Sequence, residues 1–240
     1  MGSSAIPGDP ERVIWHPSPN FGERREGALP DMVVIHYTAM ESAESARDWL
    51  CNSAAEVSAH YVIGRTGTCW HLVEEEMRAW HAGAGSWGAV SDVNSRSIGI
   101  ELANTGFQPF SEPQMASLEL LLEEILRRWA IRPERVIGHS DMAPSRKIDP
   151  GTRFDWQRLA RKNLGVWPQG GDRDFELDLT ETFRQKTTEF GYPEVDNEIL
   201  LMAFRSRFRP GKTGDLNATD VAMIGDLARR FPVDQQIFNA

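Results

Sequence analysis

Two histidines and one aspartate have the residue types and positions of a metal site. His36 ends one apolar run, and His139 directly follows another. Asp149 comes ten residues after His139, across a segment whose two prolines fix the backbone and exclude a regular helix. Two imidazoles and one carboxylate suit Zn²⁺ and leave a fourth position for water. Three ligands far apart in sequence are a weak spacing signal, so an ordinary polar loop at 138–151 stays an alternative.

Glu101 and Lys147 add groups that could carry out hydrolysis. Glu101 lies within the apolar run 97–102, where a carboxylate is costly to bury unless it is paired or used. Near a metal-activated water it can act as a general base. Lys147 can direct its ammonium at the oxyanion that forms on an attacked carbonyl. The alternative is that Lys147 is an ordinary surface lysine, which the neighbouring Arg146 favours. The five residues together are what a metal-assisted amide hydrolase requires.

Apolar patterns predict the elements that must position these groups. Short β-branched runs predict buried strands, and apolar residues at three- and four-residue spacings predict a long helix from Met115 to Trp129. We expect a capping box from Ser111 to Gln114 to open this helix. The Gly- and aromatic-rich segment 79–88 predicts the wall of a groove. The expected strands are 31–37, 58–63, 68–73, 97–102 and 135–137, and shorter helices are expected at 42–52 and 156–164.

Composition divides the chain into four parts. Residues 1–30 are rich in Pro, Gly and charge and predict an extended arm, followed by a catalytic domain at 31–168. Linker composition at 169–174 precedes a small helical domain at 175–240. Helical patterns in this last part cover roughly 175–190, 195–208 and 217–230.

Charge and hydropathy exclude several classes of protein. A net charge of −9 over 240 residues argues against non-specific binding of nucleic acid, which needs a basic surface. No apolar run approaches the roughly 18 residues of a membrane span, and the first residues lack the features of a signal peptide. We therefore expect a cytoplasmic monomer, with the periplasm or cell envelope as the alternative if a leader has been removed. Two cysteines exclude a disulfide framework.

Five ordered motifs resemble a known enzyme family over about residues 15–168. The motifs are Val34–Ala39, Ser58–Tyr61, Ala79–Gly83, Ser97–Leu102 and Gly138–Gly151. They look like the zinc-dependent N-acetylmuramoyl-L-alanine amidases of the AmpD/AmiD type, the amidase-2 family related to peptidoglycan recognition proteins. The resemblance implies an α/β fold with a mixed central β-sheet flanked by helices.

The resemblance also implies an activity. It implies one Zn²⁺ per chain on His36, His139 and Asp149, with Glu101 as catalytic base and Lys147 as oxyanion stabiliser. The bond cleaved joins N-acetylmuramic acid, or its 1,6-anhydro form, to L-Ala of the stem peptide. Peptidoglycan fragments such as anhydro-muropeptides, or the intact wall, are the expected partners, in cell-wall recycling or remodelling. A non-catalytic muropeptide-recognition module on the same fold is the alternative, which the complete set of five residues disfavours. The predicted substrate-binding residues are Tyr37, His60, Trp80, His81, Ala103 and Asn104.

The C-terminal part has a separate resemblance. The segment 203–210, followed by Gly214, Asp215 and Thr219, is similar to the small helical peptidoglycan-binding domain that follows AmiD-type catalytic domains. The usual glutamine after the Ala-Phe pair is Arg205 here. Binding of peptidoglycan and simple docking onto the catalytic domain both stay open.

Overall fold

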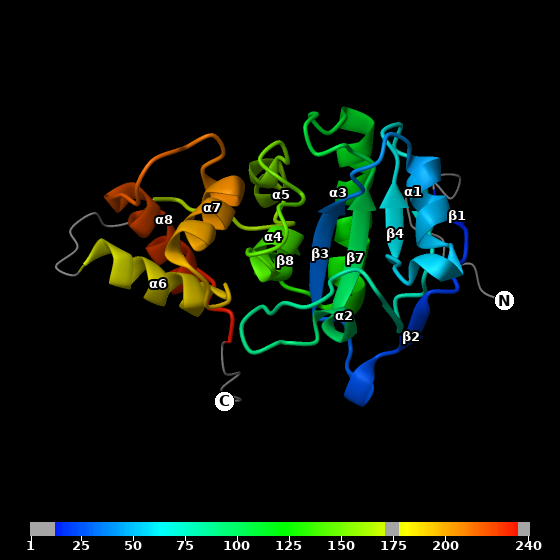
Figure 1. Ribbon diagram of the computed structural model, residues 1–240, viewed down its shortest axis with the longest axis horizontal. Helices are drawn as coiled ribbons and strands as arrows, with labels where there is room; N and C mark the ends of the chain where they lie inside the picture. Colours follow the sequence, from blue (N-terminus) through cyan, green and yellow to red (C-terminus); the bar gives the residue numbers. More distant parts are fainter. Residues whose placement is uncertain (1–12, 171–177, 235–240) are drawn as a thin grey trace.

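The computed structural model describes residues 13–170 and 178–234, and its centre is a six-stranded sheet (Figure 1). The strand order is β1-β5-β4-β7-β3-β8, in which only the β4–β5 pair is antiparallel. The expected mixed α/β fold is therefore confirmed. The strands of this sheet are β1 (Val13–Trp15), β3 (Met32–Tyr37), β4 (Tyr61–Ile63), β5 (Cys69–His71), β7 (Ser97–Leu102) and β8 (Val136–Gly138).

The register of the two central strands places His36 and Glu101 on one face. β3 and β7 are parallel, and His36 lies directly opposite Glu101. Because side chains alternate along a strand, paired residues point to the same side of the sheet. The opposite face of both strands, which carries residues such as Ile35 and Ile100, packs on the long helix α3 (Glu112–Trp129).

Helix α3 forms where the apolar spacing predicts it, but the predicted capping box at its start is wrong. Ser111 makes no side-chain cap and donates its hydroxyl to the Arg65 carbonyl. The Gln114 amide donates to the carbonyls of Ile63 and Ala103. The Gln114 side chain therefore bonds to the carbonyls at the end of β4 and just after β7 instead of bonding back to the helix start, since a buried carbonyl without a partner is costly.

Three helices follow the sheet and agree with the three predicted patterns: α6 (Leu179–Phe190), α7 (Asn197–Phe208) and α8 (Ala218–Arg230). They lie at one end of the molecule, beyond β8 and the short helices α4 (His139–Met142) and α5 (Trp156–Arg161), and β1 lies at the other end (Figure 1). One apolar cluster joins this helical unit to the sheet, and it includes Ile137, Met142, Phe190 and Phe204. The helical unit therefore docks on the catalytic part through a shared core.

The predicted arm contributes strands where the structure describes it. β1 adds to the sheet edge beside β5, and β2 (Phe21–Glu23) pairs with β6 (Met77–Ala79) in a second, two-stranded sheet. Residues 1–12 of the arm and 171–174 of the predicted linker lie outside the described residues. The remaining elements are the helices α1 (Ala43–Leu50) and α2 (Val93–Arg96) and the 3₁₀ turns at Arg25–Gly27, Ser53–Ala55 and Pro133–Arg135.

Two further expectations concern covalent and membrane features. Cys51 and Cys69 are free thiols. Among the described residues, each helix is too short or too polar to cross a bilayer.

Candidate active site

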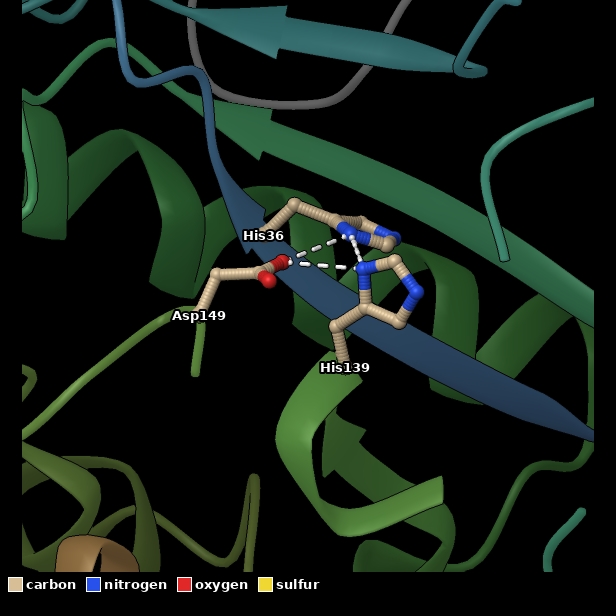
Figure 2. Close-up of side chains that lie close together, drawn as sticks. All are labelled: His36, His139 and Asp149. Atoms are coloured by element: carbon tan, nitrogen blue, oxygen red, sulfur yellow. Dashed lines mark hydrogen bonds and ion pairs between the residues drawn. The ribbon is translucent and has the colours of Figure 1, made fainter. Parts of the chain in front are cut away.

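His36, His139 and Asp149 converge on one point, as Figure 2 shows. The Nδ1 atoms of His36 and His139 are 2.9 Å apart, and Asp149 Oδ2 lies 3.0 Å from the first and 3.1 Å from the second. His36 comes from the end of β3, and His139 begins α4. The Ser140 backbone amide donates to the Asp149 carbonyl, which closes the intervening loop and brings the aspartate back to the start of α4.

The outer nitrogen of His139 fixes which ring nitrogen faces this point. Nε2 lies 2.8 Å from the Ala82 carbonyl, which can only accept a hydrogen bond. Nε2 therefore carries the proton, and we assign a lone pair to Nδ1. Arg146 also donates to the Ala82 carbonyl and to that of Ala84, so this acceptor is held in place.

A longer chain of contacts fixes His36 in the same way. Ser97 Oγ donates to the Val93 carbonyl at 2.5 Å, so it accepts at 3.2 Å from Nε2 of His81. Nδ1 of His81 then has a lone pair and accepts from Nε2 of His36 at 3.0 Å. His36 is left with a lone pair on Nδ1, the atom that faces His139 and Asp149.

The three inner atoms fit a divalent cation. Two imidazole lone pairs and a carboxylate oxygen at about 3 Å spacing repel one another unless a positive charge lies among them. Burial, together with the neighbouring His139, lowers the pKa of His36 to about 4, so this ring stays neutral and able to ligate. Nitrogen and oxygen atoms this close suit one ion with bonds of about 2.0–2.2 Å.

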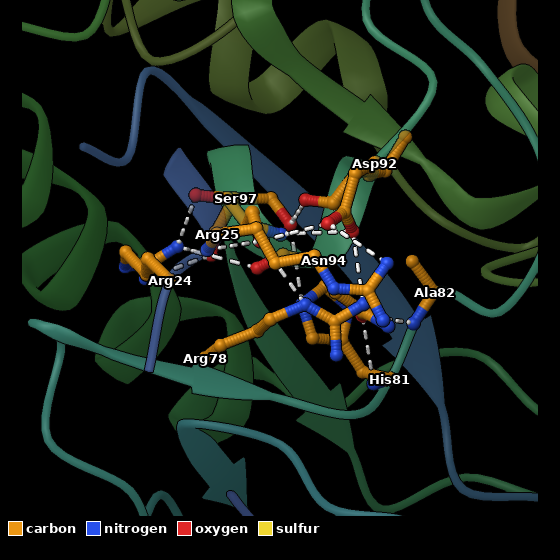
Figure 3. A network of polar contacts seen from close by, with 10 residues as sticks. Arg24, Arg25, Arg78, His81, Ala82, Asp92, Asn94 and Ser97 are labelled. Carbon is orange, nitrogen blue, oxygen red and sulfur yellow. Dashed lines mark hydrogen bonds and ion pairs between the residues drawn. The ribbon is translucent and has the colours of Figure 1, made fainter. Parts of the chain in front are cut away.

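A polar network holds the backbone behind the histidines (Figure 3). Asn94 Oδ1 accepts from the backbone amides of His81 and Ala82 at 3.1 and 2.9 Å. The buried Arg24 guanidinium donates to the carbonyls of Asn94 and Ser97. The network therefore fixes both the partner of His36 and the carbonyl that orients His139.

Gly99 gives the His81 ring its space. A Cβ atom at Gly99 would lie 2.4 Å from Cγ of His81, far inside contact distance. A glycine in the middle of β7 therefore marks a close approach of the ring rather than a flexible strand.

Glu101 and Lys147 line the same cavity as the three ligands, which has a volume of about 430 Å³. Burial, and secondarily the charge of Asp149, raises the pKa of Glu101 to about 8, against a lowering effect of Lys147. Its Oε2 is buried and has no hydrogen-bond partner among the described residues. An unpaired carboxylate with a raised pKa in a cavity is typical of a proton-transfer group.

The predicted substrate-binding residues divide into two groups. Tyr37, Trp80 and His81 line the cavity. The other three lie outside its lining and are bonded to the fold. His60 accepts from the Gly99 amide and contacts the Met77 carbonyl, the Ala103 amide donates to Ile63, and Asn104 bonds to Gly106 and Gln108.

Comparisons with known proteins show the family of this chain. The Amidase_2 family model, described as N-acetylmuramoyl-L-alanine amidase, matches residues 26–152. N-acetylmuramoyl-L-alanine amidase AmiD from Escherichia coli K12 is 33% identical over 234 residues, which cover 85% of this chain and 84% of AmiD. The chain belongs to the amidase-2 family.

Solved structures of amidase-2 proteins have the same fold. A complex of Escherichia coli AmiD with anhydro-N-acetylmuramic acid-L-Ala-D-γ-Glu-L-Lys superposes with a TM-score of 0.75 at 32% identity, covering 90% of this chain and 99% of that one. AmpDh3 from Pseudomonas aeruginosa, in complex with anhydromuramic pentapeptide, gives 0.76 at 30% identity, covering 91% and 96%. The likeness therefore includes the C-terminal helices.

Several lining residues have no signal in the sequence. Trp49, half-exposed on α1, Val57 and Arg146 face the cavity of this amidase-2 chain. Ala43, Ala46 and Leu50 are the residues of α1 that are buried, and Trp49 lies beside them on the exposed side of the helix. An exposed tryptophan beside a buried face is the one feature that could have indicated a binding role.

Proposed function

We propose that this chain is a zinc-dependent N-acetylmuramoyl-L-alanine amidase that cleaves muropeptides between the lactyl carbonyl of N-acetylmuramic acid and L-Ala. The observation that carries the proposal is the convergence of three lone-pair atoms beside an unpaired glutamate, in a cavity large enough for a sugar–peptide junction. Both superposed amidase structures hold anhydro-muropeptides, which supports the same class of substrate here.

His36, His139 and Asp149 would hold the zinc ion. When bound, the ion acts as a Lewis acid toward water and the scissile carbonyl. The neutral tautomers of both histidines are fixed by the Ala82 carbonyl and by the His81–Ser97 chain, so the ligand atoms are oriented before the ion arrives.

Glu101 moves the proton. Its carboxylate takes a proton from the attacking water as the water oxygen bonds to the lactyl carbonyl carbon. It then gives that proton to the amine of L-Ala as the C–N bond breaks. A pKa raised to about 8 suits both transfers near neutral pH, and a bound cation lowers it from that value.

Lys147 and the cavity walls position the reacting amide. The Lys147 ammonium faces the cavity and can donate to the oxyanion of the tetrahedral intermediate. Trp49 and Trp80 present aromatic surface in the same cavity, and such rings suit the apolar faces of sugars.

Digestion of a defined muropeptide tests the proposal. The full-length chain loaded with Zn²⁺ is incubated with anhydro-N-acetylmuramyl tripeptide and separately with intact sacculi, and product masses are measured. Release of free tripeptide that stops after chelation of zinc and returns on its addition is expected. Binding of the muropeptide without any cleavage would overturn the proposal in favour of a recognition module.

The same digestion separates recycling from remodelling. Cleavage of the soluble fragment alone would assign the chain to recycling, and cleavage of sacculi would assign it to the wall. The cytoplasmic location and the monomeric state stay predictions, which cell fractionation and light scattering test.

A further inference from the structure

We propose that Arg207 and Tyr192 of the C-terminal unit are positioning residues for the metal ligand His139. They act through Asp141, which lies on the same helical turn as His139. The inference rests on the proposed zinc site. It adds to that site two residues from the C-terminal part of the chain, which the sequence predicts to be a separate domain.

Asp141 accepts hydrogen bonds from three donors, none of which is one of the proposed metal ligands. Oδ2 accepts from the Gly138 backbone amide at 2.7 Å and from the Arg207 guanidinium at 2.6 Å. Oδ1 accepts from the Tyr192 hydroxyl at 2.7 Å. The side chains of Arg207 and Asp141 are 2% and 1% exposed, so this ion pair has almost no contact with solvent. Buried charge-assisted hydrogen bonds are strong and directional.

The contact fixes the start of α4, where His139 lies. Gly138 is the residue before His139, and its amide is bonded to Asp141. Arg207 also donates to the Val136 carbonyl at 3.0 Å, so it links α4 to β8. Its guanidinium stacks 4.2 Å from the ring centroid of Trp156, which limits its movement.

The same unit also supports the carbonyl that orients the His139 ring. Trp87 contacts Tyr192 at a centroid distance of 5.2 Å, and the Gly88 amide donates to the Gly191 carbonyl. Trp87 and Gly88 continue the segment that carries Ala82, the acceptor of His139 Nε2–H. His139 is therefore held from both sides by groups that contact the C-terminal unit.

Zinc affinity of full-length variants tests this positioning role, measured by competition with a chromophoric chelator. Arg207→Met is expected to weaken Zn²⁺ binding by about 10- to 100-fold, the effect typical of removing a group that orients a ligand. Arg205→Met is the matched control, because Arg205 lies on the same helix and forms an equally buried ion pair with Asp220, remote from α4. It is expected to keep wild-type zinc affinity.

A milder pair of variants keeps the test valid if Arg207→Met does not fold. Tyr192→Phe removes one O–H donor from Asp141 and is expected to weaken zinc binding by a smaller factor than Arg207→Met. Tyr61→Phe removes an equivalent donor, which bonds Glu75 at 2.7 Å, and is expected to leave zinc affinity unchanged. In Arg207→Met and Tyr192→Phe, kcat is expected to fall while KM for the muropeptide stays constant. Arg207→Lys should recover part of the zinc affinity that Arg207→Met loses.

The outcomes separate this inference from the proposed function. Wild-type zinc affinity in both Arg207→Met and Tyr192→Phe would overturn the positioning role and leave the amidase proposal intact. Equal losses in the test and control variants would also overturn it, because they would reflect folding alone. A wild-type chain that binds no zinc would overturn the metal site, and the inference with it.

Discussion

Asp141 and Asp149 are buried carboxylates near opposite ends of one segment, and they meet opposite kinds of partner. Asp141 is surrounded by donors: a backbone amide, a tyrosine hydroxyl and an arginine. Asp149 faces the lone pairs of His36 and His139. The protein therefore neutralises Asp141 with its own Arg207, whereas Asp149 forms with the two histidines a group that could hold a metal ion.

The difference separates a structural carboxylate from a ligating one. Both side chains are buried, so burial alone cannot distinguish them. The hydrogen-bonding character of the neighbouring groups distinguishes them. Donors stabilise the charge of a carboxylate, whereas the lone pairs of neighbouring acceptors repel it unless they share a cation with it. Two substitutions test this distinction directly and two test the groups around the site; all four follow in order of decreasing expected effect.

Replacement of the ligating carboxylate is expected to have the largest effect. Asp149→Ala should weaken zinc binding by more than the roughly 100-fold upper range for groups that only orient ligands, and turnover should fall to background. The metal content of dialysed protein, measured by atomic absorption, checks this. Undiminished zinc in the variant would exclude Asp149 as a ligand.

Replacement of the proton-transfer group should separate chemistry from metal binding. Glu101→Gln is expected to keep its zinc and to lose about 10²- to 10⁴-fold in kcat, because the amide cannot take the proton from water. Steady-state kinetics on anhydro-muropeptide, with metal content as control, measure the effect. A wild-type kcat would rule out Glu101 as the base.

Replacement of the structural carboxylate should act on stability first. Asp141→Ala leaves the Arg207 guanidinium buried without its counter-charge, and the free energy of unfolding should fall by about 3–5 kcal/mol. Urea unfolding of zinc-free protein measures this loss, and Asp149→Ala, which removes a carboxylate from among acceptors, is the matched comparison. Equal losses in both variants would contradict the distinction drawn between the two carboxylates.

A single added methyl group should have the smallest effect. Gly99→Ala places a Cβ against the His81 ring and is expected to cost about 1–3 kcal/mol by overpacking, with weaker zinc binding because His81 orients His36. Thermal unfolding and chelator competition measure the two effects. Gly22→Ala is the control, since its Cβ would meet nothing within 4 Å.

Local pattern predicted most of the fold. Strand β7 follows from its continuous apolar run, α3 from its spacing, and α6 to α8 from amphipathic segments separated by Gly and Pro. The error at the start of α3 arises because a side chain has a choice of partners. Gln114 bonds to the carbonyls of Ile63 and Ala103 rather than to the helix start.

Of the six residues predicted to bind substrate, three line the cavity and three do not. Tyr37, Trp80 and His81 line the cavity, whereas His60, beside a buried strand, is bonded to backbone groups of neighbouring strands. His60 and His81 have similar surroundings in sequence but different positions in the structure, because the contacts that separate them come from distant segments.

The residue types at positions 36, 101, 139, 147 and 149 by themselves determined that metal-assisted hydrolysis was possible, since imidazole and carboxylate groups ligate zinc and a carboxylate can transfer protons. Tertiary structure decided the partners of each carboxylate: donors surround Asp141, whereas Asp149 lies against two imidazoles with which it could hold a metal ion. His36 reaches Asp149 across 113 residues, and Arg207 reaches Asp141 across 66. Local sequence does not encode such long-range partners. They exist only after the sheet and the helical unit have packed on α4.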